Sequence, residues 1–320
     1  MKNHLFVGLG LVFTSYAGWS ADVPFPDADE SHDIGSAAAW GSVTPQPGDT
    51  VQFAGGKTYV LSADKSLPGP MQMTGTGKTV FDFSKDQKTL TVDGDVQDAA
   101  SVGRETVLKG GSWNLTSGFQ SYLHANAGSL LLDGVTMTAA TSLPLFGSGG
   151  TLASNSSCIL TNESKVTVRA GDSVYFRASG SNWCTNNEFL VTGGSVLTAT
   201  GDLRLGGTYG GFTDGHAIGN RFVVRGAGSK VDVGGTTVLG YQSSDTTILI
   251  EDGGWMNSKT LKVGSSAGSV ASSRNTLIVR NGGVCTNGTD STFGAALGSD
   301  SNRVFVLDCG QSTVKVSYTV

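Results

Sequence analysis

The chain has little proline, histidine and charge for its length. Seven prolines, four histidines and a charged fraction of 15% accompany 47 glycines in 320 residues, and the formal net charge is −5. A negative net charge argues against nucleic acid or an anionic membrane surface as a partner. The hydrophobic fraction of 38% is large enough to build a core, so the glycine content does not indicate disorder.

Few segments have apolar residues at the intervals of three and four that are typical of an amphipathic helix. Valine and leucine occur in short runs of β-type residues, with threonine and serine between them, and Gly, Asn, Asp and Ser separate the runs. Short runs of this kind between turn residues are typical of an all-β fold.

The N-terminus has the pattern of a secretory signal peptide. Lys2 precedes an apolar run, Leu5–Phe13, and small residues follow it. Ser15-Tyr16-Ala17 fits the small-x-small cleavage rule better than Trp19-Ser20-Ala21 does, because Trp19 is bulky. We assign residues 1–21 to a signal peptide and expect an exported protein, extracellular or on the surface of a bacterial envelope. The apolar run is too short to span a bilayer, and no later segment is long enough.

Two segments nearly repeat each other. Residues 220–229 read NRFVVRGAGS and residues 275–284 read NTLIVRNGGV, so Asn, Val, Arg and Gly recur at the same relative places. Further units have the same pattern, in which a short strand precedes glycine. To align the units we use the last apolar residue of that strand, which we call the anchor. The anchors are Leu108, Leu132, Val168, Val191, Val224, Ile250, Val279 and Val306.

Each unit contains three short β-type segments, and the first and third residues of a segment are expected to face inward. A single unit cannot bury its inner face, but stacked units share one core and pair their backbones. The sequence therefore predicts an all-β fold, a single-stranded parallel β-helix solenoid with three short strands per rung. We assign it to residues 47–320, after an irregular N-terminal segment or cap at residues 22–46.

Two polar columns follow from this alignment. Asparagine recurs four residues before the anchor, with Ser164 and Thr246 at that place in other rungs, and charged residues of alternating sign follow the anchor. Opposite charges on neighbouring strands stabilise a sheet by up to about 1 kcal/mol per pair. We therefore interpret both columns as structural ladders that set the register: Asn187, Asn220, Asn275 and Asn302 in one, and Lys109, Asp133, Arg169, Arg225, Glu251 and Arg280 in the other.

The first rung carries a family resemblance. PGDTV at residues 47–51, followed by GGKTY at residues 55–59, resembles the opening rung of secreted right-handed parallel β-helix proteins. Later units, such as NEFLVTGGSVLTATGDLRLGG at residues 187–207, resemble the autotransporter-type β-strand repeats of large bacterial surface proteins. The resemblance implies a right-handed β-helix and a passenger-like surface module, and it specifies fold far better than activity.

A carbohydrate-active enzyme, either a polysaccharide lyase or a glycoside hydrolase, is the alternative. Hydrolysis needs two carboxylates on one face, and no Asp-Asp pair occurs in the sequence. Asp214-Gly215-His216 reads as a polar loop. A lyase needs cationic residues beside a bound carboxylate, for which Arg177, Arg204 and Lys262 are the candidates. We assign no catalytic residue and expect no turnover of pectin, alginate or glycosaminoglycan.

Metal-binding and cofactor signals are weak. Asp93-Gly94-Asp95 with Asp98, and Asp27-Ala28-Asp29 with Asp33, match no calcium-loop pattern and read as turns and caps. No cofactor is expected.

The four cysteines form two candidate pairs, Cys158 with Cys184 and Cys285 with Cys309. Each pair misses a shared column by three residues, about 10 Å along a strand, which is beyond disulfide reach unless a turn redirects the chain. Buried free thiols are favoured, although export would permit two bridges.

The C-terminal residues 312–320 read as the second segment of a rung, and their Val/Tyr alternation predicts an adhesive edge. We expect self-association through residues 302–320. The function that these features favour is an exported, non-enzymatic surface or passenger-type module, structural or adhesive, with surface glycans or its own copies as partners. A self-assembling stalk is a further hypothesis.

Overall fold

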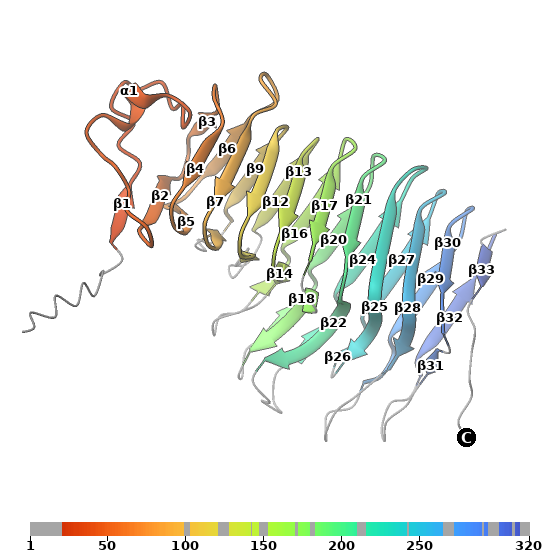
Figure 1. Ribbon diagram of the computed structural model, residues 1–320. Coiled ribbons are helices and arrows are strands. Elements are labelled where there is room, and N and C mark those ends of the chain that lie inside the picture. Colours follow the sequence, from red (N-terminus) through yellow and green to blue (C-terminus); the bar gives the residue numbers. More distant parts are fainter. Residues whose placement is uncertain are drawn as a thin grey trace, which may run out of the picture.

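The structure is a computed structural model. It describes residues 21–98, 103–120, 128–141, 143–146, 153–169, 172–179, 183–209, 216–241, 243–264, 272–289, 291–293, 301–308 and 311–313. Short strands stack on one another along a rod, and the chain advances along it from the N-terminal to the C-terminal end (Figure 1). The described part of the chain contains one helical turn, α1 (Ala37–Trp40), and is otherwise built from strands and turns. The fold is therefore the predicted all-β solenoid.

Four sheets form the walls of the rod. Sheet A contains β1 (Asp22–Pro24), β2 (Thr50–Ala54), β5 (Met71–Thr74), β8 (Val96–Asp98) and β11 (Phe119–Gln120). Sheet B contains β3 (Thr58–Val60), β6 (Lys78–Asp82), β9 (Glu105–Lys109), β12 (Ser129–Asp133), β16 (Ser157–Thr161), β20 (Glu188–Val191), β24 (Arg221–Arg225), β27 (Thr247–Glu251), β29 (Thr276–Val279) and β32 (Arg303–Val306).

Sheet C is the largest and sheet D the smallest. Sheet C contains β4 (Lys65–Leu67), β7 (Thr89–Val92), β10 (Ser112–Leu115), β13 (Thr136–Ala139), β14 (Leu143–Phe146), β17 (Lys165–Val168), β18 (Asp172–Ser179), β21 (Val196–Ala199), β22 (Asp202–Tyr209), β25 (Lys230–Tyr241), β28 (Trp255–Val263), β30 (Val284–Asn287), β31 (Thr292–Phe293) and β33 (Gln311–Thr313). Sheet D contains β15 (Ala153–Ser154), β19 (Trp183–Thr185), β23 (His216–Ile218) and β26 (Ser243–Ser244).

The strands pair in parallel and mostly in register, rung on rung. In sheet B, for example, Leu108 of β9 lies beside Leu132 of β12, and Val224 of β24 lies beside Ile250 of β27. Because side chains alternate between the two faces of a strand, such pairing stacks equivalent residues into columns along the rod. The residues of one column are therefore of similar type over several rungs, either inside the core or on the surface.

Seven of the eight predicted anchors form one inward column of sheet B, and the eighth was wrong. Val168 lies in β17 of sheet C, between Ala139 and Ala199, while Leu160 of β16 occupies its expected place between Leu132 and Val191. Both segments have apolar first and third residues, and they differ only at the middle residue, which is Ile159 in β16 and Thr167 in β17. With Leu160 as the anchor the adjoining spacings become 28 residues (132 to 160) and 31 residues (160 to 191).

Large aromatic side chains fill the core of the N-terminal rungs. Phe53, Tyr59, Phe81 and Trp113 form a chain of ring contacts from one rung to the next, with centroid separations between 5.1 and 5.7 Å. Towards the C-terminal end, valine, leucine and isoleucine replace most of these rings. Stacked rings and branched aliphatic chains exclude water from the core, and this burial is the main stabilising term of the fold.

The segment 22–46 closes the N-terminal end. It contains β1 and α1, so it is more ordered than the irregular segment expected from its sequence. Its Phe25, Ile34 and Trp40 are buried against the first core layer, and the Trp40 indole donates to the carbonyl of Ile34 over 2.8 Å. The backbone N–H of Ile34 donates to the carbonyl of Val60, and the N–H of Val60 donates to the carbonyl of His32, so these bonds occupy part of the free edge of β3. The apolar end of the solenoid is thus covered on this side.

The last described strand of sheet B is different. β32 pairs with β29 on one side and with no other described strand on its other side. Phe305, Val306 and Leu307 are between 38 and 46% exposed, whereas the equivalent anchor Val279 is fully buried. No helix within the described ranges is long and apolar enough to cross a membrane.

Glycines in the left-handed region make room for the asparagine column. Gly240 has φ +80°, and a Cβ built on it would lie 2.2 Å from the amide nitrogen of Asn275. We expect Gly240→Ala to lower the free energy of unfolding by at least about 2 kcal/mol, because the added methyl group is both strained and in collision. Urea denaturation provides the measurement.

Gly288→Ala is the matched control. An added Cβ there meets its nearest heavy atom, the carbonyl oxygen of Lys259, at 3.6 Å, which is ordinary contact. This variant should stay within about 0.5 kcal/mol of the parent protein. Equal losses in the two variants would show that the asparagine column imposes no special requirement on Gly240.

Candidate functional site

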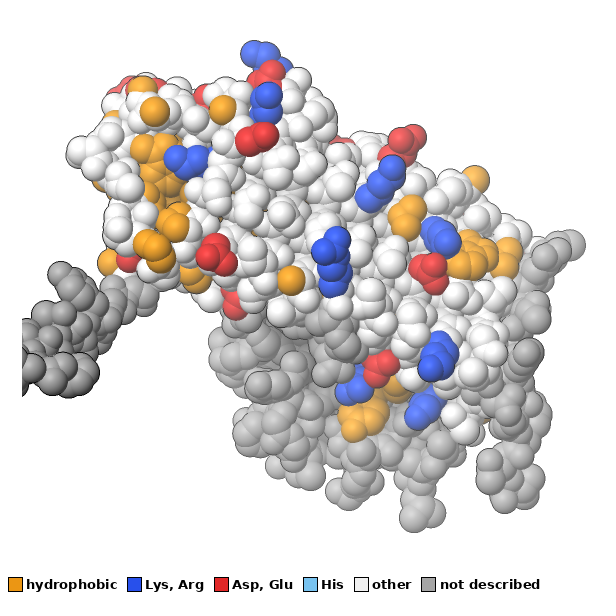
Figure 2. Space-filling view, viewed as in Figure 1, with side chains coloured by type: hydrophobic (Ala, Val, Ile, Leu, Met, Phe, Trp, Pro, Cys, Tyr) orange, Lys and Arg blue, Asp and Glu red, His pale blue; other side chains and the backbone are white. Residues whose placement is uncertain are grey.

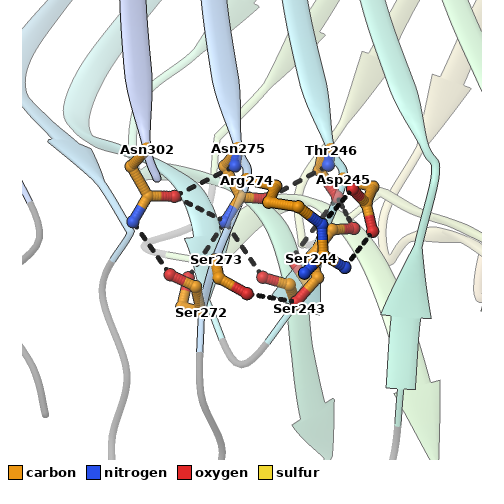
Figure 3. Close-up of polar contacts among 9 residues, drawn as sticks. All are labelled: Ser243, Ser244, Asp245, Thr246, Ser272, Ser273, Arg274, Asn275 and Asn302. Atoms are coloured by element: carbon orange, nitrogen blue, oxygen red, sulfur yellow. Dashed lines mark hydrogen bonds and ion pairs between the residues drawn. The ribbon is translucent and has the colours of Figure 1, made fainter. Parts of the chain in front are cut away.

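A column of polar side chains stands directly before the strands of sheet B (Figure 3). The Oδ1 atom of Asn302 accepts hydrogen bonds from the backbone N–H and the side-chain amide of Asn275, both at 3.0 Å. Asn275 in turn accepts from the backbone N–H of Thr246 at 3.1 Å. Each amide also donates to a backbone carbonyl, Asn275 to Ser243 and Asn302 to Ser272. The amides therefore join one rung to the next.

The same column continues towards the N-terminus. The backbone N–H of Asn187 donates to Asn220 and that of Ser156 donates to Asn187, each over 3.0 Å. Ser156, rather than the expected Ser164, holds this place, because the register of that rung follows Leu160. Ser164 is buried at the start of β17, where its hydroxyl donates to the carbonyl of Leu132. Buried amides and hydroxyls that satisfy backbone groups in this way stabilise rung corners.

Charged side chains form the second predicted column on the outside of sheet B. Glu251 lies between Arg225 and Arg280 and contacts their guanidinium groups at 2.5 and 2.6 Å. The Glu251 side chain is only 4% exposed, and both arginines are nearly half exposed. Burial opposes ionisation of Glu251, but the hydrogen bonds and charges of the two arginines outweigh it and hold the pKa of Glu251 below its usual value.

The N-terminal part of this column differs from the prediction. Lys109 lies beside Asp133 in the register, and its ammonium group pairs with Asp82 of the preceding rung at 2.9 Å, which raises the pKa of Lys109. Arg169 is not a neighbour of Asp133. It follows β17 in sheet C, and Thr161 takes the expected position beside Asp133. The misplaced anchor Val168 accounts for this error.

Sheet C presents a face of a different kind, which sequence reasoning missed. The outward residues at one position of successive strands are short and hydrogen-bonding, and all but one are uncharged. These residues are Ser66, Thr91, Asn114, Thr138, Thr167, Thr198, Asp232, Asn257 and Thr286. We call them the polar column. Figure 2 looks onto this wall of the rod, where much of the middle surface is uncharged.

A tryptophan stands beside the C-terminal part of the polar column. Trp255 of β28 lies next to Lys230 of β25 in the register, and the Lys230 ammonium group is 4.4 Å from the ring centroid. The polar neighbours are linked, since Asn257 donates to Asp232 at 3.1 Å and Thr286 donates to Asn257 at 2.9 Å. The repeated polar middle residue of the second segment of each rung was the sequence signal for this surface.

Two of the cations considered for a lyase, Arg204 and Lys262, are not neighbours. Arg204 and Lys262 share an outward column of sheet C, but Val238 stands between them, and Arg204 pairs with Asp202 at 2.9 Å. Arg177 belongs to β18, and its side chain lies outside the described residues. Asp214 and Gly215 also lie outside them, as does the side chain of His216 at the start of β23.

The acidic N-terminal turn holds one buried carboxylate. Asp27 contacts the imidazole and the backbone N–H of His32, and the Lys57 ammonium group lies 3.3 Å away. Burial opposes ionisation here, but these hydrogen bonds outweigh it and lower the pKa of Asp27. Within the described ranges, no cluster of three or more His, Cys, Asp or Glu residues is arranged to hold a metal ion.

The cysteines whose side chains are described, Cys158, Cys184 and Cys285, are buried free thiols, as expected. Burial raises the pKa of Cys158, and it raises that of Cys285 to about 12. Cys309 lies outside the described residues.

Comparison of the chain with protein-family models, with curated proteins and with solved structures finds no match in any of the three. Support for a functional site therefore comes from the geometry of this chain alone. That geometry consists of two ladders that hold the rungs in register and one uncharged, hydrogen-bonding wall beside Trp255.

The Glu251 ladder leads to a pH-dependent prediction. Because its pKa is lowered in the folded state, Glu251 stabilises the protein above its ordinary pKa of 4.5, and this contribution is lost as the pH falls through the folded-state pKa. We expect Glu251→Gln to reduce the free energy of unfolding by about 1–2 kcal/mol at neutral pH, since the arginines are partly screened by water. The difference from the parent protein should vanish in strong acid.

Urea denaturation across this pH range measures the effect. Glu163→Gln is the control, because Glu163 is an exposed carboxylate in a turn. It should leave stability unchanged at every pH. A loss at Glu251→Gln that persists in acid would mean that the ion pairs do not stabilise the fold.

Proposed function

We propose that this chain is an exported, non-enzymatic surface module of the passenger type, and that it adheres to surface glycans through the outer wall of sheet C. The single observation that carries the proposal is the polar column with Trp255 beside it. Sugars present hydroxyl groups for hydrogen bonding and apolar C–H faces for contact with an aromatic ring. The polar column supplies the first kind of partner and Trp255 the second.

The wall suits adhesion because its side chains are short and already ordered. Threonine, serine and asparagine lose less side-chain entropy on binding than lysine, glutamate or glutamine would. Hydrogen bonds between Asp232, Asn257 and Thr286 further fix their positions. Columns repeat at about 4.8 Å along the stack, so a long polymer meets the same groups on successive rungs. Many weak contacts of this kind add to a useful affinity.

The pairing of charges favours adhesion over catalysis. Arg204, the best placed of the cations considered for a lyase, is bound to Asp202, and the most buried carboxylate of the sheet B column, Glu251, is held by two arginines. Acid–base catalysis needs groups whose pKa is tuned towards neutrality. The pKa of Glu251 is shifted away from neutrality instead.

Retention on insoluble polysaccharides tests this proposal. We expect the mature chain to be retained on at least one of pectin, alginate, cellulose or chitin particles, and to release no soluble or unsaturated sugar. Trp255→Ala should reduce the bound fraction severalfold, because it removes the aromatic contact. Trp40→Phe is the control for loss of an indole, since Trp40 is buried in the N-terminal cap.

Two results would contradict the proposal. Binding that is equal in the parent chain and in Trp255→Ala would remove the wall of sheet C from the adhesive surface. Release of unsaturated sugar that stops in Arg204→Ala or Lys262→Ala would establish a lyase instead.

We also propose that the chain associates with its own copies through the C-terminal end of the rod. The N-terminal end is covered by Trp40 and its neighbours, whereas Phe305 and Val306 of β32, and Leu307 directly after it, remain exposed. A strand with a free edge and exposed apolar residues favours pairing with another chain. Residues 314–320, which belong to the predicted adhesive edge, lie outside the described residues.

Sedimentation velocity over a range of concentrations measures this association. We expect complexes larger than the monomer at tens of micromolar, a range in which exposed edges associate. Val306→Lys should weaken them, since it places a charge on the exposed apolar end. Val60→Lys alters an exposed valine at the covered end and should change nothing. Association that survives Val306→Lys unchanged would place the contact elsewhere.

A further inference from the structure

The outer surface of sheet B carries an uninterrupted column of apolar side chains. Its members occupy the middle outward position of nine successive strands. They are Val80, Val107, Leu131, Ile159, Leu190, Val223, Leu249, Ile278 and Phe305. None of them belongs to the core cluster, which contains the inward residues on either side, such as Phe189 and Val191 around Leu190. We call this set the apolar column.

An apolar column is unusual on a wall that faces water. A sheet with one solvated face alternates apolar and polar residues, whereas a sheet covered on both faces reads as continuous apolar runs. The strands of sheet B read in the second way, as in Leu130-Leu131-Leu132 and Ile248-Leu249-Ile250. The outward middle residues of sheet C are mostly Thr and Asn, so the apolar runs are a property of sheet B and not of the whole solenoid.

Side chains that are charged or polar, except for Leu307 at the C-terminal end, flank the apolar column on both sides, and we call the two sets the first and the second rail. The first rail is Lys78, Glu105, Ser129, Ser157, Glu188, Arg221, Thr247, Thr276 and Arg303. The second rail is Asp82, Lys109, Asp133, Thr161, Thr192, Arg225, Glu251, Arg280 and Leu307. Three members of the column, Val107, Val223 and Leu249, are only 5%, 1% and 4% exposed, so neighbouring side chains cover part of the column. Phe305 at the end of the rod is 38% exposed.

The dimensions of this face match a protein interface. Nine strands span roughly 38 Å at their usual spacing, and three outward positions with their side chains span roughly 20 Å, which gives on the order of 750 Å². A stable interface buries about 800 Å² on each partner. An apolar centre with a polar, charged rim is also the usual anatomy of such an interface.

Charge complementarity selects a second copy in one orientation. Two identical faces related by a twofold axis along the rod bring the first rail of one copy against the second rail of the other, rung by rung. Lys78 then lies opposite Asp82, and Glu105 opposite Lys109; within each chain Lys78 already pairs with Glu105 at 2.6 Å and Lys109 with Asp82 at 2.9 Å, so the contact joins these ion pairs into one network. One pair of like charges, Arg221 and Arg225, also lies opposite. A twofold axis across the rod reverses the order of the rungs, and the charged residues that then lie opposite each other all have the same sign. These pairs are Lys78 with Arg303, Lys109 with Arg280, Asp133 with Glu251, and Glu188 with Glu188 of the other copy.

We propose that two copies of the chain pack side by side through the outer faces of sheet B, with their rods parallel and the apolar columns in contact. Sheets that pack face to face lie about 10 Å apart with their strands aligned, and the apolar columns then fill the space between them. Burial of the columns supplies the attraction, and the rails set the orientation. This dimer does not depend on export or on the adhesion proposed for sheet C.

The oligomeric state of matched variants tests the contact. All measurements use the Val306→Lys background, which weakens the proposed end-to-end contact. We expect a dimer by sedimentation equilibrium at tens of micromolar, a range in which exposed apolar surface commonly associates. Leu190→Lys should raise its dissociation constant at least about a hundredfold, because it buries unpaired like charges at the centre of the face.

Gln72→Lys is the control, since Gln72 is an outward, mid-strand residue of sheet A, and it should leave the dimer intact. Circular dichroism checks that each variant retains its β structure, which an outward substitution should not disturb. A monomer in the Val306→Lys background, or a dimer unchanged by Leu190→Lys, would overturn the proposal.

Crosslinking tests the orientation in a Cys309→Ser background, where the remaining cysteines are buried. Facing residues about 10 Å apart are too distant for a disulfide but within reach of a short bismaleimide. In the parallel dimer, Leu131→Cys and Ile278→Cys should each crosslink to the same residue of the other copy. If Leu131→Cys crosslinks only to copies that carry Leu249→Cys, the rods are antiparallel and the proposed arrangement is wrong.

Discussion

Parallel pairing between successive rungs is the constraint on which the rest of this structure depends. It places each residue beside its equivalent in the next rung, about 4.8 Å away. A residue type that suits one rung then suits its neighbours, and the surface becomes a set of columns. Asparagine is favoured before the strands of sheet B because one amide can serve two rungs, accepting from the backbone N–H of one rung and donating to a backbone carbonyl. Asn275 makes both kinds of contact.

The same constraint leaves the rung at each end of the rod with only one neighbour, and the two ends differ in what covers the other side. Every interior rung has its backbone and its core covered by two neighbours, and an end rung has only one. At the N-terminal end the second neighbour is replaced by Phe25, Ile34 and Trp40, and by hydrogen bonds to the edge of β3. At the last described rung Val306 is 46% exposed at a position where Val279 is fully buried. The difference in exposure between Val306 and Val279 shows how much of an anchor side chain the next rung buries.

The sequence was sufficient to predict the solenoid, most of the register of sheet B and the Arg225–Glu251–Arg280 neighbours, because all three follow from a repeated pattern. It was not sufficient where two patterns look alike. The segments that end at Leu160 and Val168 both have apolar first and third residues. The predicted anchor follows the polar middle residue Thr167, although the segment with the apolar middle residue Ile159 is the one that belongs to sheet B. Choosing Val168 misplaced Arg169 and Ser164 together, since both were counted from the same anchor.

The outer faces were overlooked for a related reason. The middle residue of a strand was taken to be polar from Val166-Thr167-Val168, which is true of sheet C. In sheet B the middle residue is apolar, as in Leu277-Ile278-Val279, yet it points away from the core. Hydrophobicity alone does not reveal the side of a strand on which a residue lies. Comparison of equivalent positions in the two sheets reveals it, because the first and third residues are apolar in both and only the middle residue differs.

This difference between walls would allow one rod to carry both proposed interactions, self-association through sheet B and adhesion through sheet C. Inward and corner columns determine the fold, and each outward column adds one residue per rung without altering the core. A dimer through sheet B leaves the wall of sheet C uncovered in both copies, since the two sheets are separate walls of the solenoid. The two polar columns would then run in the same direction along one particle. A long polymer that met both would bind with an effective concentration set by their separation, so the proposed dimer would strengthen the proposed adhesion without any new contact to the glycan.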